Sequence, residues 1–539
     1  MVFRFPAREW PLLLTNHLSS PKVIIWNIGC LPGKIGLESK PSQTDLDQKT
    51  NIERPFLNES GRKSSRAWIV LILFTLALQI LSIWSLELSG RDSPRVAGIA
   101  REMAVTSDYL IPRLNGENFL EYPSLGYWPM ALTLSISKKP PDFLAFLPVV
   151  FLGIGTVLIT YLIGKVVAGE QIGLMAGFIL STMSGFGSLH RHCRVDAALL
   201  FFITLSLYGF VAGYRTPRKR SLFFAVFYLA MAGAFLSKGI IGMAIPAATA
   251  VVFLITQKDF MALRRLLLSP GILFFLLPIL LWVGSVWWLE GSGVFKEVMR
   301  QSLSRFFSPT ADHTKPFYFY LIPTFLHLMP WTFFLLILLW YRWKPNHSTD
   351  PLPHGSLLRF GLVWFLVVFI GLSIASAKRP LYLGPILPPS GLLAALGWNL
   401  IRVKFPKVKR FEIYGLIVLF LAIAGTYLPF VTPSENKESL RPVFEAVSNQ
   451  PISGPLYLVN PSETTRGASF FYLGKRVPVL NVQVLLQGRF EDRPGTTFVI
   501  DSFCDNDRLL SNLLSKGYRL LSQRKYGKAS GICVYSNSF

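Results

Sequence analysis

The sequence predicts a polytopic α-helical membrane protein with a large first external loop and a small C-terminal α/β domain outside the cytoplasm. Three observations predict this class. Hydrophobic residues make up 51% of the 539 residues and charged residues only 16%, whereas soluble domains carry about 25% charged residues. Eleven apolar runs approach the ~20 residues that a helix needs to cross a bilayer. Residues 432–539 have instead the mixed composition of a folded soluble domain.

The eleven apolar runs fix the expected membrane domain. The first, WIVLILFTLALQILSIWSLEL, lies near residues 68–88. The other ten lie near residues 143–167, 171–189, 197–213, 221–236, 239–256, 267–289, 316–341, 357–376, 380–401 and 411–431. Short or Pro-broken helices, such as the stretch 127–137, leave the count open between eleven and 12–13.

Loop charge predicts the orientation. The chain has 54 Lys and Arg against 30 Asp and Glu, a net charge of +24. In a soluble protein this balance would suggest a nucleic-acid partner. In a membrane protein Lys and Arg gather in cytoplasmic loops and meet anionic lipid, so we expect membrane lipids as partners and no nucleic acid. With a cytoplasmic N-terminus, the loops after the fourth, sixth, eighth and tenth runs carry the basic residues on one side, and the C-terminus is periplasmic.

Three regions follow from these patterns. Residues 1–66 are a polar, cytoplasmic extension, for which disorder stays open. Residues 67–431 form the membrane domain, with a first external loop over residues 89–142. Residues 432–539 form a periplasmic α/β domain, in which we expect a helix over 433–447, strands at 456–459, 477–480 and 497–501, a helix over 505–516 and two closing strands.

Cysteine spacing excludes a zinc ribbon or a disulfide framework. The four cysteines are Cys30, Cys193, Cys504 and Cys533, and they form no CxxC or Cys/His pattern. Cys504 and Cys533 either pair in an oxidising compartment or remain two buried thiols.

The ionisable residues near the ends of the apolar runs lie on one face of the expected membrane domain. The expected external loops contain Asp92, Glu121, Asp196, Lys238, His313 and Lys378. An active site open to the outer leaflet requires this segregation. Each residue alone could equally be a helix-end charge at the interface, where it costs little.

The stretch 89–128 carries the most informative motifs, namely DSPR (92–95), IAREM (99–103), PRLNG (112–116) and EYPSLGYW (121–128). Further blocks follow around Asp196, around Lys238, from His313 and from Ser376. In this combination and order they resemble the GT-C glycosyltransferases that use polyprenyl-phosphate sugars. The nearest are the bacterial aminoarabinose-to-lipid-A transferases and their protein O-mannosyltransferase relatives. The resemblance covers roughly residues 68–400.

The resemblance implies a role for each acidic group. Asp92 would be the catalytic base that deprotonates the acceptor, although DSP is also a helix N-cap sequence. Arg95, one helical turn along, could hold Asp92 ionised or be a solvated helix charge. Asp196 would support catalysis or cap its helix.

The donor phosphate and a metal ion complete the implied site. Lys238, Lys378 and Tyr122 would bind the donor phosphate, although lysines at helix ends also snorkel to lipid headgroups. Glu121 and His313 would be the metal ligands, and a carboxylate with an imidazole suits zinc or manganese.

The sequence departs from the family pattern at three positions. Ser93 replaces a second acidic residue, Tyr122 a lysine and Ser124 a proline. These changes put the donor, and activity itself, in question.

We therefore expect an inverting glycosyltransferase in the bacterial inner membrane. It would move a sugar from a polyprenyl-phosphate donor to lipid A or another envelope glycolipid at the outer face. The alternative is a protein O-mannosyltransferase-like enzyme, for which the acceptor is a Ser or Thr side chain of a protein. A transporter or lipid flippase is the alternative of another class, but such proteins place ionisable residues near the bilayer midplane and often show repeats.

Overall fold

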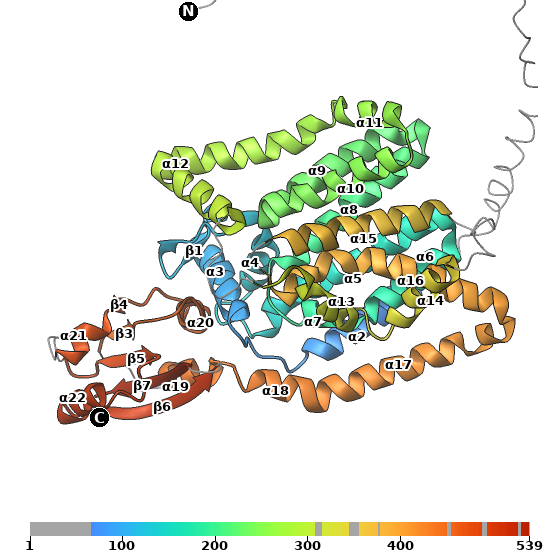
Figure 1. Cartoon of the computed structure of the whole chain (residues 1–539). Helices are drawn as coiled ribbons and strands as arrows, with labels where there is room; N and C mark the ends of the chain where they lie inside the picture. Colours follow the sequence, from blue (N-terminus) through green and yellow to red (C-terminus); the bar gives the residue numbers. More distant parts are fainter. Residues whose placement is uncertain are drawn as a thin grey trace, which may run out of the picture. The chain divides into compact units, whose positions relative to one another are not determined.

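The computed structural model describes residues 66–307, 315–343, 355–375, 378–449, 454–487, 493–526 and 530–537. Apolar helices dominate the region up to residue 431, and a small sheet domain follows (Figure 1). The helices of the apolar region outside its first loop are α2 (Ala67–Ile83), α5 (Phe143–Ala168), α6 (Glu170–Ser181), α7 (Ser184–His190), α8 (Asp196–Arg215), α9 (Arg220–Lys238), α10 (Ile240–Thr256), α11 (Phe260–Leu267), α12 (Ile272–Phe307), α13 (Leu321–His327), α14 (Thr332–Trp343), α15 (Gly355–Ile374), α16 (Leu387–Lys404) and α17 (Glu412–Thr426).

Each predicted apolar run contains helix, but the number of spans is not confirmed as eleven. Within the described residues, seven helical stretches are long and apolar enough to cross a bilayer. The number rises to nine if each of two bent pairs is one span: α6 with α7, bent by 61°, and residues 317–327 with α14, bent by 112°. Helices α2 and α10 are apolar but shorter.

Small residues let these helices approach each other closely. A Cβ at Gly209 of α8 would lie 2.6 Å from the backbone nitrogen of Phe227 in α9. A Cβ at Gly164 of α5 would lie 2.6 Å from the Cα of Gly173 in α6. Since apolar lipid provides no hydrophobic drive between helices, close packing of this kind stabilises the bundle.

The loop between α2 and α5, residues 84–142, is folded and is called the first loop below. It holds α3 (Asp92–Thr106), the hairpin β1 (Arg113–Leu114) and β2 (Glu117–Asn118), a 3-10 turn (Ser124–Gly126) and α4 (Trp128–Leu134). Asn115 and Gly116 join the two strands with φ of 55° and 93°. Two successive positive φ angles are what an Asn-Gly hairpin turn provides. Apolar residues of α3 and α4 pack with the start of α5 in one buried cluster.

The C-terminal domain is a five-stranded sheet with helices packed against it. A π-helical turn (Tyr427–Val431), α18 (Thr432–Asn436) and α19 (Arg441–Ser448) lead into it. Its strands are β3 (Leu456–Val459), β4 (Val479–Leu480), β5 (Thr497–Asp501), β6 (Arg519–Tyr526) and β7 (Ser530–Ser536), in the order β4-β3-β5-β7-β6. Strand β3 runs parallel to β4 and β5, while β7 is antiparallel to β5 and β6. The helices are α20 (Glu463–Leu473), α21 (Val482–Leu486) and α22 (Asp507–Ser515).

The local patterns predicted most of this domain. Strands β3 and β5 begin and end where expected, and α22 starts after Asn506, whose side chain accepts the Leu509 N–H at 3.0 Å. The helix expected over 433–447 is instead two helices, α18 and α19. Cys504 and Cys533 form a disulfide, one of the two alternatives. The sequence reading missed α20 altogether.

Candidate active site

Asp92 is the first residue of α3, on the first loop. Gly90, at φ 69°, turns the chain immediately before the helix. Pro94 lies in the first helical turn, where a missing N–H costs no hydrogen bond. No backbone N–H of the described chain donates to the Asp92 carboxylate, which pairs with two arginines instead. Asp92 is therefore not the N-cap of α3, the alternative that the sequence left open.

The guanidinium of Arg95 is shared by three carboxylates. Its Nη2 lies 3.0 Å from Asp92 on the same helix. Its Nη1 lies 3.3 Å from Glu121 of the first loop and 2.6 Å from Glu463 of α20. The side chains of Arg95, Asp92 and Glu121 are 15%, 18% and 13% exposed, whereas that of Glu463 is 56% exposed. Charge-assisted hydrogen bonds contribute about 1.5–3 kcal/mol each where they are withdrawn from water, and exposed ion pairs about 0–1 kcal/mol.

A second arginine binds the other oxygen of Asp92. The guanidinium of Arg194, in the segment between α7 and α8, lies 3.2 Å from Asp92 Oδ2. Burial alone raises the pKa of the Asp92 carboxyl. Four cations oppose this effect, in decreasing order Arg194, Arg95, Arg379 and Lys238. Their combined field prevails and holds the pKa of Asp92 below its ordinary value, so the group is a carboxylate at neutral pH.

Lys238 forms the second part of the site. It is the last residue of α9, and its Nζ lies 2.5 Å from Asp196, the first residue of α8. Its ammonium lies 5.5 Å from the ring centre of Tyr122 and 5.1 Å from that of Tyr382. Two aromatic rings and one carboxylate thus surround this cation.

The two groups form one site. Glu121 and Tyr122 are neighbours in the chain, and one contacts Arg95 while the other contacts Lys238. The charge of Lys238 also acts on Asp92. The site therefore combines four carboxylates with four cations, drawn from the first loop, the membrane helices, the segment before the 3-10 turn at 380–386, and α20: Asp92, Glu121, Asp196, Glu463, Arg95, Arg194, Lys238 and Arg379.

Two predicted residues are not placed in this cluster. Lys378 is buried, and its Nζ donates to the backbone carbonyl of Ala375 at 2.5 Å. The neighbouring Arg379, rather than Lys378, acts on Asp92. His313 lies outside the described residues, so its pairing with Glu121 stays a prediction.

Among the described residues, the charged groups nearest Glu121 and Asp92 are cations rather than further metal ligands. Glu121 contacts a guanidinium, and the field that lowers the pKa of Asp92 is cationic. No group of three or more potential His, Cys, Asp or Glu ligands gathers among the residues that the structure describes. A cationic environment of this kind suits an anion such as a phosphate.

The three departures from the expected motif are accommodated by packing. The Tyr122 ring faces the Lys238 ammonium. Ser93 and Ser124 are each 1% exposed, and the Ser124 hydroxyl has no hydrogen-bond partner among the described residues.

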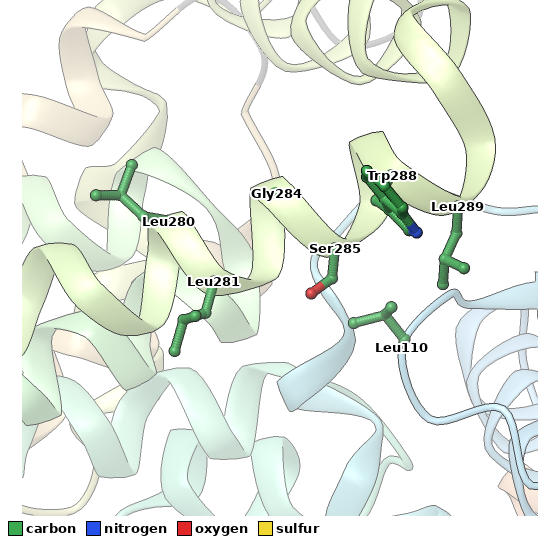
Figure 2. A pocket seen from close by; sticks show the side chains of 7 residues that line it. All are labelled: Leu110, Leu280, Leu281, Gly284, Ser285, Trp288 and Leu289. Carbon is green, nitrogen blue, oxygen red and sulfur yellow. The ribbon is translucent and has the colours of Figure 1, made fainter. Parts of the chain in front are cut away.

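A pocket of about 400 Å³ lies where α12 passes the first loop (Figure 2). Its lining residues are Leu110, Leu280, Leu281, Gly284, Ser285, Trp288 and Leu289. The Trp282 indole N–H donates to the Leu110 carbonyl at 3.4 Å. Beyond the pocket, Arg113 pairs with Glu290 of α12 at 2.9 Å, which ties the hairpin to that helix.

Comparison with known proteins gives similar sequences and a similar fold. Residues 121–288 match a family model described as dolichyl-phosphate-mannose-protein mannosyltransferase. An undecaprenyl phosphate-alpha-4-amino-4-deoxy-L-arabinose arabinosyl transferase of Proteus mirabilis is 28% identical over 68% of this chain. An uncharacterised protein of Aquifex aeolicus is also 28% identical, over 67% of this chain. The matched region spans 65% and 68% of these two relatives, so it covers about two thirds of their length.

The crystal structure of ArnT from Cupriavidus metallidurans bound to undecaprenyl phosphate superposes with a TM-score of 0.69. That match has 18% sequence identity and covers 88% of this chain and 98% of the ArnT chain. This chain has the GT-C fold of ArnT and resembles the aminoarabinose transferases. The resemblance inferred from the motifs of the first loop is thereby confirmed.

Within this GT-C fold, sequence reasoning missed four site residues: Arg194, Arg379, Tyr382 and Glu463. Arg194 and Arg379 lie within the RHCRVDAAL and SAKRPLYLGPILP blocks, next to Asp196 and Lys378, so adjacency was a usable signal. Glu463 follows Ser462, whose side chain caps α20 at Thr465 N. Ser462 and Gly474, at φ 66°, cap the two ends of α20, and they are the signals from which this missed helix could have been predicted.

We expect the Asp92 carboxyl to stay ionised to a lower pH than an ordinary aspartate, because its pKa lies below the ordinary value. In Arg194→Gln it should protonate at a higher pH, because burial is then less opposed. The pH at which Asp92 becomes protonated can be followed by the infrared C=O band of the protonated carboxyl. The band that disappears in Asp92→Asn is assigned to this residue.

Arg113→Gln is the control, since Arg113 pairs with Glu290 and Asp108 instead. If the band that is lost in Asp92→Asn is already present at neutral pH in the wild type, Asp92 is not ionised there and the prediction is wrong.

Proposed function

We propose that this chain is an inverting glycosyltransferase that moves a sugar from a polyprenyl-phosphate donor to an envelope acceptor. The observation that carries the proposal is the clustering of an ionised carboxylate and several cations on the first loop and the helix ends next to it. The similarity to undecaprenyl-phosphate-dependent arabinosyl transferases supports it. Because its charges lie at loop and helix ends rather than along the spans, the site favours an enzyme over a transporter.

The proposed reaction is a single displacement. The acceptor hydroxyl donates its proton to Asp92 while its oxygen attacks the anomeric carbon of the donor sugar. The bond between that carbon and the phosphate oxygen breaks, and the polyprenyl phosphate leaves with the electron pair. Because the pKa of Asp92 is low, it is a weak base. Proton transfer is therefore expected late in this displacement, as the forming bond makes the hydroxyl more acidic.

The leaving phosphate gains negative charge, which the site can neutralise. Lys238, Arg194 and Arg379 are the cations we assign to it. Fixed charges in a water-poor site stabilise a developing anion without reorganising. Asp196 contacts Lys238 at 2.5 Å and orients its ammonium. The metal site of Glu121 and His313 stays a prediction, and none of these steps depends on it.

The donor's hydrocarbon chain needs an apolar surface beside the charged site. We assign it to the pocket on α12, which is lined mainly by leucine and tryptophan and adjoins Leu110 of the first loop (Figure 2). The pairing of Arg113 with Glu290 keeps the pocket and the first loop together.

The finer assignments are part of the proposal. The positive charge of alternate loops supports a cytoplasmic N-terminus and a periplasmic first loop and C-terminal domain. The disulfide between Cys504 and Cys533 supports an oxidising compartment for that domain. Lipid A or another glycolipid is the proposed acceptor. The match to a protein mannosyltransferase model over residues 121–288 favours protein Ser/Thr as the alternative.

The proposal predicts that membranes containing the full chain transfer 4-amino-4-deoxy-L-arabinose, or a related sugar, from undecaprenyl phosphate to lipid A. Asp92→Asn should lower the transfer rate by about 10²–10⁴-fold, the usual contribution of a general base. Mass spectrometry of the lipid and protein products measures how much sugar is transferred and identifies the acceptor.

Glu117→Gln is the matched control, because Glu117 is a carboxylate of the same loop that pairs with Arg466 and lies outside the site. Transfer by Asp92→Asn at the wild-type rate would refute its role as base. Sugar found on protein but not on lipid would favour the alternative acceptor.

The pocket assignment predicts that Gly284→Phe raises the KM for a long-chain donor several-fold and leaves kcat nearly unchanged. Gly284 lines the pocket and a Cβ there would meet no atom within 4 Å, so the backbone admits a side chain at this position. Gly415→Phe on α17 is the control, because its Cβ also meets nothing within 4 Å. Steady-state kinetics with donors of long and short chains test this. An equal KM change for both chain lengths would contradict the assignment.

A further inference from the structure

The C-terminal domain contacts the first loop through α20. A Cβ at Gly98 of α3 would lie 2.3 Å from the Gly467 carbonyl oxygen, and one at Gly467 would lie 2.5 Å from the Arg95 Cα. The Thr464 hydroxyl donates to the Arg91 carbonyl at 3.0 Å. The two helices therefore touch at backbone distance beside the site (Figure 1).

The sheet of the C-terminal domain fixes the start of α20. Asp501 is fully buried at the carboxyl end of β5. It accepts the Ser462 N–H at 2.9 Å and the Thr465 hydroxyl at 2.5 Å. Since Glu463 lies between these two residues, its backbone is anchored to the sheet rather than to a mobile loop.

Glu463 reaches from this anchored position into the site. Its Oε2 lies 2.6 Å from Arg95 Nη1, the shortest of the three carboxylate contacts of that guanidinium. The Arg95 Nε is buried and has no hydrogen-bond partner in the described chain. The contacts of the two terminal nitrogens therefore orient the guanidinium, together with the Phe119 ring, whose centre lies 5.5 Å from the guanidinium carbon. With Nη1 bound by Glu463 and Glu121, Nη2 is turned to Asp92.

We propose that Glu463 is a positioning residue for the transfer reaction, acting through Arg95, and that the C-terminal domain is thereby part of the active site. This inference rests on the proposed function. Glu463 does not act on substrate in this account. It holds Arg95 in the orientation in which its charge keeps Asp92 ionised and in place for the acceptor hydroxyl.

A second ion pair of the same helix separates positioning from docking. Arg466 of α20 pairs with Glu117 of β2 at 2.5 Å and so also joins the two regions. It makes no contact with Arg95 or Asp92 in the described chain. Glu117→Gln thus removes a docking contact and leaves the site intact.

The kinetic test compares three variants of the full chain in membranes. Glu463→Gln should lower kcat about 10–100-fold, the usual cost of a misplaced catalytic group, with the donor KM within twofold. Glu463→Asp should recover part of the loss, because it keeps the charge. Glu117→Gln should stay within twofold of the wild type. A wild-type kcat in Glu463→Gln, or an equal loss in Glu117→Gln, would overturn the inference.

A measurement without turnover keeps the inference apart from the proposed function. Phenylglyoxal reacts with accessible guanidinium groups, and mass spectrometry of the peptide with Arg95 reads the rate. We expect a rise of at least about threefold in Glu463→Gln and none in Glu117→Gln, because only the first releases Arg95. An unchanged Arg95 rate in Glu463→Gln overturns the positioning role. Absence of transfer by the wild type, with the Arg95 rate raised, would overturn the proposed reaction alone.

Discussion

The arrangement of the site depends on one guanidinium. Arg95 connects Asp92 on its own helix, Glu121 further along the first loop and Glu463 of the C-terminal domain. Three carboxylates around one cation would repel each other without further positive charge, and Arg194 on the far side of Asp92 supplies it. The field of these cations outweighs the burial of Asp92 and keeps it ionised. Protonation state, loop position and domain docking therefore follow from the same few contacts.

The sequence was sufficient for features set by local patterns. Apolar runs located the helices, and short apolar stretches located β3 and β5. It also singled out Arg95 and the two carboxylates Asp92 and Glu121, with which Arg95 pairs. It could not supply Glu463, which lies 368 residues from Arg95, because such contacts depend on how the domains pack. The sequence also could not predict the bends that make the number of spans ambiguous. Hydropathy gives the length and composition of an apolar run, but not the direction of the helix axis along it.

The departure at Tyr122 acquires a physical meaning in the fold. A lysine there would place a second ammonium beside Lys238, with Asp196 as the nearby carboxylate. The tyrosine instead presents an aromatic face to Lys238, as does Tyr382, and cation–π contact stabilises the ammonium without adding charge. In the proposed reaction, the leaving phosphate is then bound by Lys238, Arg194 and Arg379. The site thus keeps the elements of the proposed chemistry despite the changed motif.

The most direct test of this account is Arg95→Lys. Lysine keeps the positive charge but lacks the planar fork that lets one side chain meet three carboxylates. If the shared guanidinium organises the site, the sugar-transfer rate of the full chain should fall by about tenfold or more, with the fold intact by thermal unfolding. A transfer rate equal to that of the wild type would show that charge alone suffices, and would contradict the account.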